Sequence, residues 1–164
     1  ETLPWRLKAE VAGGGKFLDM GVHVLDALSF WFGPITAVHG EASNRGGLYG
    51  VEDTVTASWQ HASGVSGTGN WCYVGHDEAD RIEITGTHGR IEFEFFADTP
   101  LRLITASGVE EMHIPNPPHV QQPFIQSIVD DLNGLRVCPG DTQVAAQISV
   151  ATDAILEQYR KQTA

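Results

Sequence analysis

The middle of this chain, residues 35–114, consists of short segments rich in Val, Ile, Thr, Phe and Trp that are separated by Gly, Asn and Asp. Such segments are typical of β-strands. The links between them are short and contain glycine, which favours antiparallel hairpins, because a parallel pair needs a crossover of about a dozen residues. Strands are therefore predicted at residues 35–43, 53–61, 65–73, 81–85, 90–96, 101–105 and 110–114.

Helical patterns flank this region, and helices are expected at residues 17–32, 120–132 and about 142–161. The first has apolar side chains at spacings of three and four, and Gly33 followed by Pro34 is a typical helix end. In the second helix Pro123 lies in the first turn, where proline is tolerated. The third begins with Asp141 or Thr142 as its N-cap.

Two of the predicted strands alternate between apolar and polar side chains, at residues 54–59 and 90–95. One face of the sheet is therefore expected to be buried and the other polar, and the later helices can cover the buried face. A helix, a series of strands and two further helices, without an internal repeat, make an α+β arrangement. We predict one domain, residues 1–164, with an open, mostly antiparallel β-sheet and helices packed on one face.

Composition excludes several classes of partner. Ten Lys and Arg residues against 21 Asp and Glu give a net charge of −11, which disfavours nucleic acid and anionic membrane surfaces. No apolar run approaches the roughly 18 residues of a membrane span, and the N-terminus lacks the apolar core of a signal peptide. We expect a cytoplasmic protein that binds neither nucleic acid nor membrane.

No metal site or disulfide is expected. The two cysteines, Cys72 and Cys138, lie far apart and match neither a disulfide framework nor a zinc motif. The histidines on strands and turns show no metal-ligand spacing: His39, His61, His76, His88 and His113.

The residues best placed for chemistry are Asp19, His23 and Asp26, all within the first predicted helix. Asp19 and His23 are four residues apart, so on an α-helix they share a face, with Cβ atoms about 5–6 Å apart. A carboxylate there can orient an imidazole, and imidazoles ordinarily titrate near neutral pH. Two interpretations stay open at this point: a catalytic pair, or a core histidine satisfied by a structural aspartate.

The run GGGKFLDMGVHVLDALSFWFG, preceded by Trp5 and Arg6, resembles the start of the C-terminal domain in the glucose-fructose oxidoreductase and inositol dehydrogenase family, written Gfo/Idh/MocA. The hallmark is a glycine-rich turn followed by D-x-x-x-H and a second D three residues on, found here as Asp19, His23 and Asp26. The segments VEDTVTASWQHASGVSGTGNW, IEITGTHGRIEF and FIQSIVDDLNG are also similar to the family, so the resemblance covers nearly the whole chain.

The resemblance implies the C-terminal half of a two-domain oxidoreductase whose N-terminal Rossmann domain binds NAD or NADP. It implies that His23 is a general acid/base for a substrate hydroxyl and that Asp19 holds the substrate or the imidazole. The family's sheet commonly forms the subunit interface, which implies a homodimer or homotetramer through the sheet face. The dinucleotide fingerprint and the lysine of an E-K-P motif are missing here, and the chain begins at Glu1, so we expect a fragment or processed chain that is inactive alone.

Other residues are weaker candidates. Arg6 and Trp5 lie just before the glycine turn and are candidates for a sugar site, through bidentate hydrogen bonds and ring stacking. His119 precedes the second helix and is a candidate for contact with the substrate. The alternatives are core packing for Trp5 and a solvent-facing His119. Trp59 and Trp71 are interpreted as sheet packing, with a subunit contact as the alternative.

Two functions from different classes follow. The first is the substrate-binding and oligomerisation domain of an NAD(P)-dependent oxidoreductase that acts on a sugar, polyol or related hydroxy compound by hydride transfer. The second is a non-catalytic module for sheet-mediated dimerisation or ligand binding. Upstream coding sequence with a GxGxxG turn would favour the first.

Overall fold

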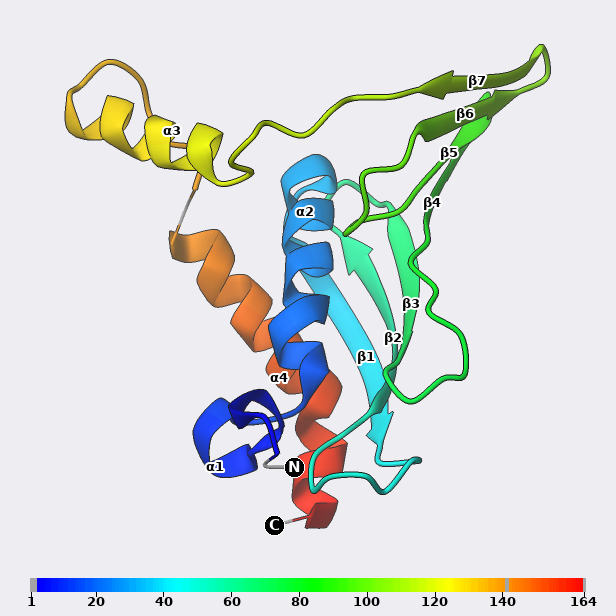
Figure 1. Cartoon of the computed structure of the whole chain (residues 1–164), viewed down its shortest axis with the longest axis vertical. Helices are drawn as coiled ribbons and strands as arrows, with labels where there is room; N and C mark the ends of the chain where they lie inside the picture. Colours follow the sequence, from blue (N-terminus) through cyan, green and yellow to red (C-terminus); the bar gives the residue numbers. More distant parts are fainter. Residues whose placement is uncertain (1–2, 141, 164) are drawn as a thin grey trace. The chain divides into compact units, whose positions relative to one another are not determined.

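The computed structural model describes residues 3–140 and 142–163 (Figure 1). These residues divide into two compact units, which we call the first unit (residues 3–76 and 142–163) and the second unit (residues 77–140). The N-cap predicted at Asp141 lies outside the described residues. The prediction of a single domain over residues 1–164 stays a prediction.

Of the helices formed by the described residues, all but one belong to the first unit: η1 (Trp5–Leu7), α1 (Ala9–Ala12), η2 (Phe17–Gly21), α2 (Val22–Phe32) and α4 (Thr142–Thr163). The helix predicted at residues 17–32 is present as η2 and α2, but its first turn, η2, is π-helical rather than α-helical. Single π-helical turns often occur at functional sites. The predicted end is confirmed, because Gly33 has a left-handed backbone (φ 84°) and donates its N–H to the Ser29 carbonyl at 2.9 Å.

The sheet of the first unit has three antiparallel strands in the order β1-β2-β3: β1 (Ile35–Ser43), β2 (Thr54–His61) and β3 (Ser66–Cys72). The alternation predicted for β2 is confirmed, since Val55, Ala57 and Trp59 are buried whereas Thr56 and Ser58 are exposed. One face of this sheet therefore belongs to the core and the other is open.

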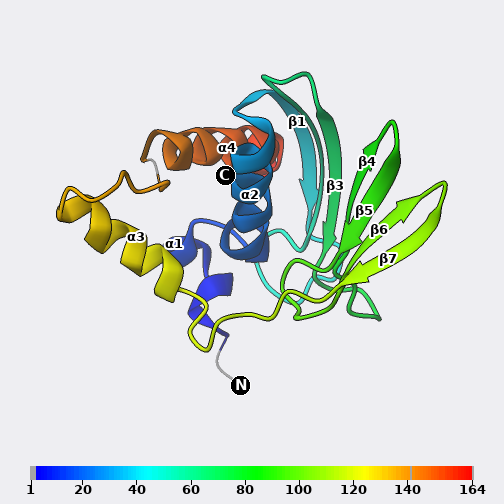
Figure 2. The same ribbon diagram turned by 90° about the horizontal axis from the view of Figure 1, so that it is seen from above.

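Helices α2 and α4 lie on the same side of the β1-β2-β3 sheet (Figure 2). Ile155 of α4 is fully buried and packs directly over Gly40 of β1. A Cβ atom on Gly40 would lie 2.6 Å from the Ile155 side chain and 3.0 Å from its Cα atom. The absence of a side chain at Gly40 thus lets α4 approach the sheet closely.

The second unit has four antiparallel strands in sequential order and one helix: β4 (Ile82–Gly86), β5 (Gly89–Phe93), β6 (Leu101–Thr105), β7 (Gly108–Met112) and α3 (Gln122–Leu132). The α+β class with antiparallel strands is confirmed. Hydrogen bonding links the strands in two sheets rather than one, because residues 73–81, between β3 and β4, form turns and bends instead of a strand. Helix α3 begins two residues later than predicted.

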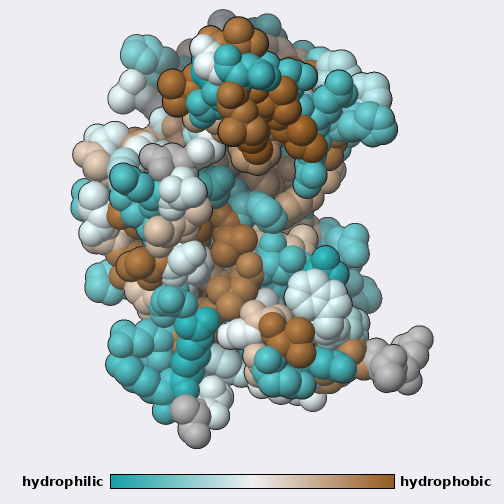
Figure 3. Space-filling model, turned by 90° about the vertical axis from the view of Figure 1, so that its left-hand side faces the viewer, coloured by the Kyte–Doolittle hydropathy of each residue, from teal (hydrophilic) through white to brown (hydrophobic). Residues whose placement is uncertain are grey.

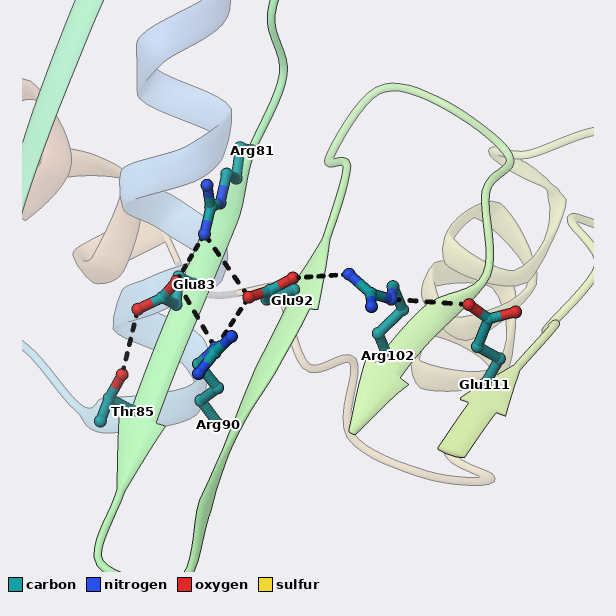
Figure 4. Close-up of polar contacts among 7 residues, drawn as sticks. All are labelled: Arg81, Glu83, Thr85, Arg90, Glu92, Arg102 and Glu111. Carbon is teal, nitrogen blue, oxygen red and sulfur yellow. Dashed lines mark hydrogen bonds and ion pairs between the residues drawn. The ribbon is translucent and has the colours of Figure 1, made fainter. Parts of the chain in front are cut away.

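One face of the four-stranded sheet has a column of ion pairs across all four strands (Figure 4). Glu92 of β5 is central, since its carboxylate oxygens lie 2.8 Å from Arg90 Nε, 3.0 Å from Arg102 Nη1 and 3.4 Å from Arg81 Nη2. The hydrogen bond from Arg90 holds the pKa of Glu92 below its ordinary value. The column extends to Glu83 on β4, which pairs with Arg81.

Helix α3 is amphipathic, as its sequence pattern predicts, but its apolar face is exposed. Apolar side chains gather over α3 at the top of the view in Figure 3. The exposed members are Phe124, Ile125, Ile128, Val129 and Leu132. Within the described part of the chain, no helix is both long and apolar enough to cross a membrane.

The contact between α4 and β1 predicts a specific sensitivity at Gly40. Gly40→Ala forces a methyl group into the Ile155 side chain and should lower the free energy of unfolding by about 1–3 kcal/mol. Gly50 is the matched control, because nothing lies within 4 Å of its Cβ position. Gly50→Ala should leave the stability unchanged or raise it by up to about 1 kcal/mol. Urea unfolding monitored by circular dichroism compares the two, and equal stabilities would contradict the close approach.

Candidate active site

The glycine triplet forms a tight turn between α1 and η2. Gly13 has a left-handed backbone (φ 76°) and donates its N–H to the Ala9 carbonyl at 2.9 Å, which ends α1. Gly14 and Gly15 are buried, and a Cβ atom on Gly15 would overlap the backbone oxygen of Glu52. Only glycine fits at position 15, so the turn places the helix backbone directly against the residue that precedes β2 by two positions.

Asp19 and His23 lie on the exposed side of the segment formed by η2 and α2. The inner side includes Phe17, which is fully buried and meets the ring of Trp71 edge-on, with ring centroids 4.9 Å apart. Leu25 continues this buried side. His23 is therefore not the buried, satisfied histidine that the structural alternative required.

Asp19 forms an ion pair with Arg6, with Asp19 Oδ2 2.9 Å from Arg6 Nε. The Arg6 guanidinium in turn lies 4.7 Å from the ring centroid of Trp5. Trp5 is 53% exposed, so core packing does not account for it. The structure thus brings three of the predicted site residues together, and it shows no hydrogen bond between Asp19 and His23 among the described residues.

The histidine that does serve the core is His61, at the end of β2. It is 2% exposed, and its Nε2 accepts a hydrogen bond of 3.1 Å from Trp59 Nε1. Its Nδ1 lies 2.7 Å from the Gly33 carbonyl oxygen and donates to it. Trp59 is buried beside Trp71, so the interpretation of these tryptophans as sheet packing holds.

Two buried acids, Glu52 and Asp53, were not singled out from the sequence. Glu52 is 2% exposed, and its Oε1 accepts a hydrogen bond of 2.7 Å from the Gly15 N–H. Burial raises the pKa of Glu52, although this hydrogen bond and the charge of Arg160 oppose the rise. Two adjacent acids directly before an alternating strand were the available signal, but Gly15, the partner of Glu52, lies 37 residues away in the sequence.

Asp53 anchors the loop between β1 and β2. Its carboxylate accepts hydrogen bonds from the N–H groups of Arg45 at 2.8 Å and Gly46 at 2.6 Å, and from the Thr54 hydroxyl at 2.9 Å. Burial alone would raise the pKa of Asp53, but these hydrogen bonds hold it below its ordinary value. Asp53 is therefore a structural carboxylate.

Two tyrosine hydroxyls are buried near these acids. The hydroxyls of Tyr49 and Tyr73 have no hydrogen-bond partner among the described residues. Burial raises the pKa of Tyr73, and the nearby carboxyls of Glu52 and Asp19 add to the effect. Lys16 lies 5.9 Å from the ring centroid of Tyr73, which places this ring beside the start of η2.

The remaining candidates are less connected. Asp26 is exposed and forms no ion pair with any described residue. His119 is exposed and belongs to the second unit, so its contact with a substrate stays a prediction. Among residues 3–140 and 142–163, no three His, Cys, Asp or Glu side chains gather as metal ligands would.

The glycine turn does not suit a dinucleotide. A pyrophosphate site needs free N–H groups at the start of a helix that follows a strand. Here the N–H of Gly15 already donates to Glu52, and the short helix α1, not a strand, precedes the turn. The glycine turn is therefore not arranged as a pyrophosphate site.

Comparison with known proteins identifies the lineage. The GFO/IDH/MocA C-terminal domain family matches residues 1–92. The chain is 30% identical over 152 residues to Oxidoreductase P35 of Formosa agariphila, an alignment that covers 91% of this chain and 46% of that protein. It is also 30% identical over 105 residues to trans-1,2-dihydrobenzene-1,2-diol dehydrogenase of Bos taurus, covering 64% of this chain and 31% of that protein.

Solved structures share the fold. Aldose-aldose oxidoreductase from Caulobacter crescentus, complexed with glycerol, superposes with a TM-score of 0.80 at 20% identity, over 97% of this chain and 49% of that one. Levoglucosan dehydrogenase, in complex with NADH and levoglucosan, gives 0.77 at 22% identity, over 99% and 53%. The chain thus spans at most about half the length of these relatives. Because the family match covers residues 1–92 of 164, the chain belongs to the GFO/IDH/MocA C-terminal domain family.

Proposed function

We propose that this chain is the substrate-binding and oligomerisation part of an NAD(P)-dependent oxidoreductase that acts on a sugar, polyol or related hydroxy compound. The observation that carries the proposal is the exposed Asp19 and His23 on a helical segment whose start is fixed by the glycine turn. The relatives named above are oxidoreductases, and one solved neighbour is described with NADH and a sugar derivative, levoglucosan.

In this proposal the dinucleotide is held by protein outside this chain. Oxidation of an alcohol removes a hydride from carbon and a proton from oxygen, and a nicotinamide supplies the hydride acceptor. The role of this chain concerns the proton. A ring nitrogen of His23 accepts it from the substrate hydroxyl, since an exposed imidazole can reach a substrate and is a common general base.

Asp19, Arg6 and Trp5 complete the site. The carboxylate of Asp19 can accept a hydrogen bond from a substrate hydroxyl or from the imidazole. Arg6 pairs with that carboxylate at 2.9 Å and has further N–H groups for substrate oxygens. The exposed ring of Trp5 offers a flat apolar surface for the C–H face of a sugar ring.

The catalytic assignment predicts a large effect at His23. In the full-length protein, His23→Ala should lower kcat by about 100-fold or more, the usual loss on removing a general acid/base, and should leave the circular dichroism spectrum unchanged. His88→Ala, in the exposed β4–β5 turn, is the control. Steady-state kinetics with NAD and NADP over a panel of polyols and aldoses measures both. Wild-type turnover and pH profile for His23→Ala would show that the catalytic assignment of His23 is wrong.

We expect that the 164-residue chain alone binds no nicotinamide, because its glycine turn is not arranged as a pyrophosphate site. The N–H of Gly15 is engaged by Glu52 and is not available to a pyrophosphate. Calorimetric titration of this chain with NADH and NADPH should give no heat of binding, whereas the full-length protein should bind one of them. Binding at about micromolar concentration by the isolated chain would contradict this division of roles.

We also propose self-association through the open, polar side of the β1-β2-β3 sheet. The alternative of a subunit contact for Trp59 and Trp71 does not fit, because both lie on the core side of the β1-β2-β3 sheet, which the helices cover. The open side is polar, and a partner sheet would contact exposed Thr56, Ser58 and Gln60 of the central strand.

The self-association proposal predicts a dimer or tetramer by multi-angle light scattering. Ser58→Arg places a large charge at the middle of the open face and should shift the mass towards the monomer, because an unpaired charge is costly to desolvate. Ser63→Arg adds the same charge in the β2–β3 turn and should leave the mass unchanged. A monomer at every concentration for the unsubstituted protein would remove the idea.

A further inference from the structure

The residue that ties the candidate active site to the sheet is Glu52, which precedes β2 by two positions. Its carboxyl is buried and accepts the N–H of Gly15 at 2.7 Å. The carbonyl of Gly15 accepts the N–H of Leu18 at 3.2 Å, so Gly15 also begins the helical hydrogen bonding of the segment with Asp19. One side chain thus holds the residue from which that helical segment starts.

The Gly13–Gly15 turn packs against both the backbone and the side chain of Glu52, which we call the seat of the turn. A Cβ atom on Gly15 would overlap the Glu52 carbonyl oxygen and lie 3.1 Å from the carboxyl carbon, and one on Gly14 would lie 3.3 Å from Oε1. Two contacts of the neighbouring Asp53 fix this seat to the sheet. Its N–H donates to the Ser43 carbonyl at 3.0 Å, and its carbonyl accepts the N–H of Tyr73 at 2.9 Å.

The ion pair of Asp19 is too weak to set the position of Asp19 by itself. The side chains of Arg6 and Asp19 are 52% and 43% exposed, and exposed pairs contribute about 0–1 kcal/mol. The position of Asp19 must therefore come from the backbone of its helical segment. That backbone is anchored at its start by Glu52 and farther along by the buried ring of Phe17.

We propose that Glu52 is a positioning residue of the candidate active site, which holds the Gly13–Gly15 turn and thereby sets where Asp19 and His23 meet the substrate. It acts through the N–H of Gly15 and touches no substrate. The inference rests on the proposed function for its effect on turnover, but the anchoring contact itself can be tested without any activity. Glutamine offers the same carbonyl acceptor without a charge, so Glu52→Gln is the conservative variant.

The kinetic test uses the full-length protein with Glu52→Ala, Glu52→Gln, and Glu157→Ala as the control. Glu157 is an exposed acid on α4 whose ion-pair partner among residues 3–140 and 142–163 is Lys161. Glu52→Ala should lower kcat/KM by about 10-fold to 100-fold, because misplacement of a site residue by about 1 Å has effects of that size. Glu52→Gln should stay within about 3-fold of the wild type, since it keeps the acceptor. An unchanged kcat/KM for Glu52→Ala would overturn the positioning role.

A double-mutant cycle separates positioning from general destabilisation. If Glu52 acts through the placement of Asp19 and His23, then Glu52→Ala should cost less than about 3-fold in a background that carries both Asp19→Asn and His23→Ala, because effects of coupled residues do not add. A full additional loss in that background would show that Glu52 affects turnover through the fold as a whole. That outcome would also overturn the proposal.

Hydrogen exchange of the backbone amides provides the readout that is independent of activity. In the full-length protein, Glu52→Ala should speed exchange at Gly15 and along η2, whereas Glu52→Gln should keep wild-type protection and α4 should not change in either. If the wild type oxidises no hydroxy compound but exchange behaves in this way, the proposed function fails and the anchor stands. If exchange at Gly15 is unchanged in Glu52→Ala, the anchor fails whatever the enzyme does.

Discussion

The first unit depends on backbone approaching backbone at positions where the chain has no side chain. Helix α4 packs closely on β1 because Gly40 leaves room for Ile155. The glycine turn contacts Glu52, two residues before β2, because Gly15 has no side chain there. These two contacts come from opposite ends of the sequence and lie against the same three strands. A helical layer assembled this way has little freedom to slide, so the side chains that it presents outward are well placed.

Local patterns predicted most of this fold. The strand at residues 35–43 and the end of α2 at Gly33 were found from β-propensity and helix-capping signals, and both depend on residues adjacent in sequence. Three features were not predicted from the sequence: the π-helical turn η2, the division of the strands over two sheets, and the hydrogen bond between Gly15 and Glu52. Each is decided by contacts between distant residues, on which spacing and propensity carry no information.

The candidate site shows the same limit in its chemistry. Arg6, Asp19 and His23 were identified through the resemblance of the sequence to a family motif. The pairing of Arg6 with Asp19 was not predicted. The structure then distinguished His61 from His23 by their burial. His61 has both ring nitrogens engaged inside the core, while His23 is exposed. In the function proposed above, the proton is therefore taken by the exposed His23 rather than by the engaged His61.

The ion-pair column on the four-stranded sheet bears on how the second unit behaves in a crowded solution. Strands β4 and β7 end the strand order, so each has an unpaired row of N–H and C=O groups that another chain can extend. A slip of one residue in the pairing of β5 would turn Glu92 away from Arg81 and Arg102 and onto the apolar side where Ile91 now lies. The charges therefore favour the observed register of this sheet, and charged side chains on its face also oppose fibril-like stacking of copies.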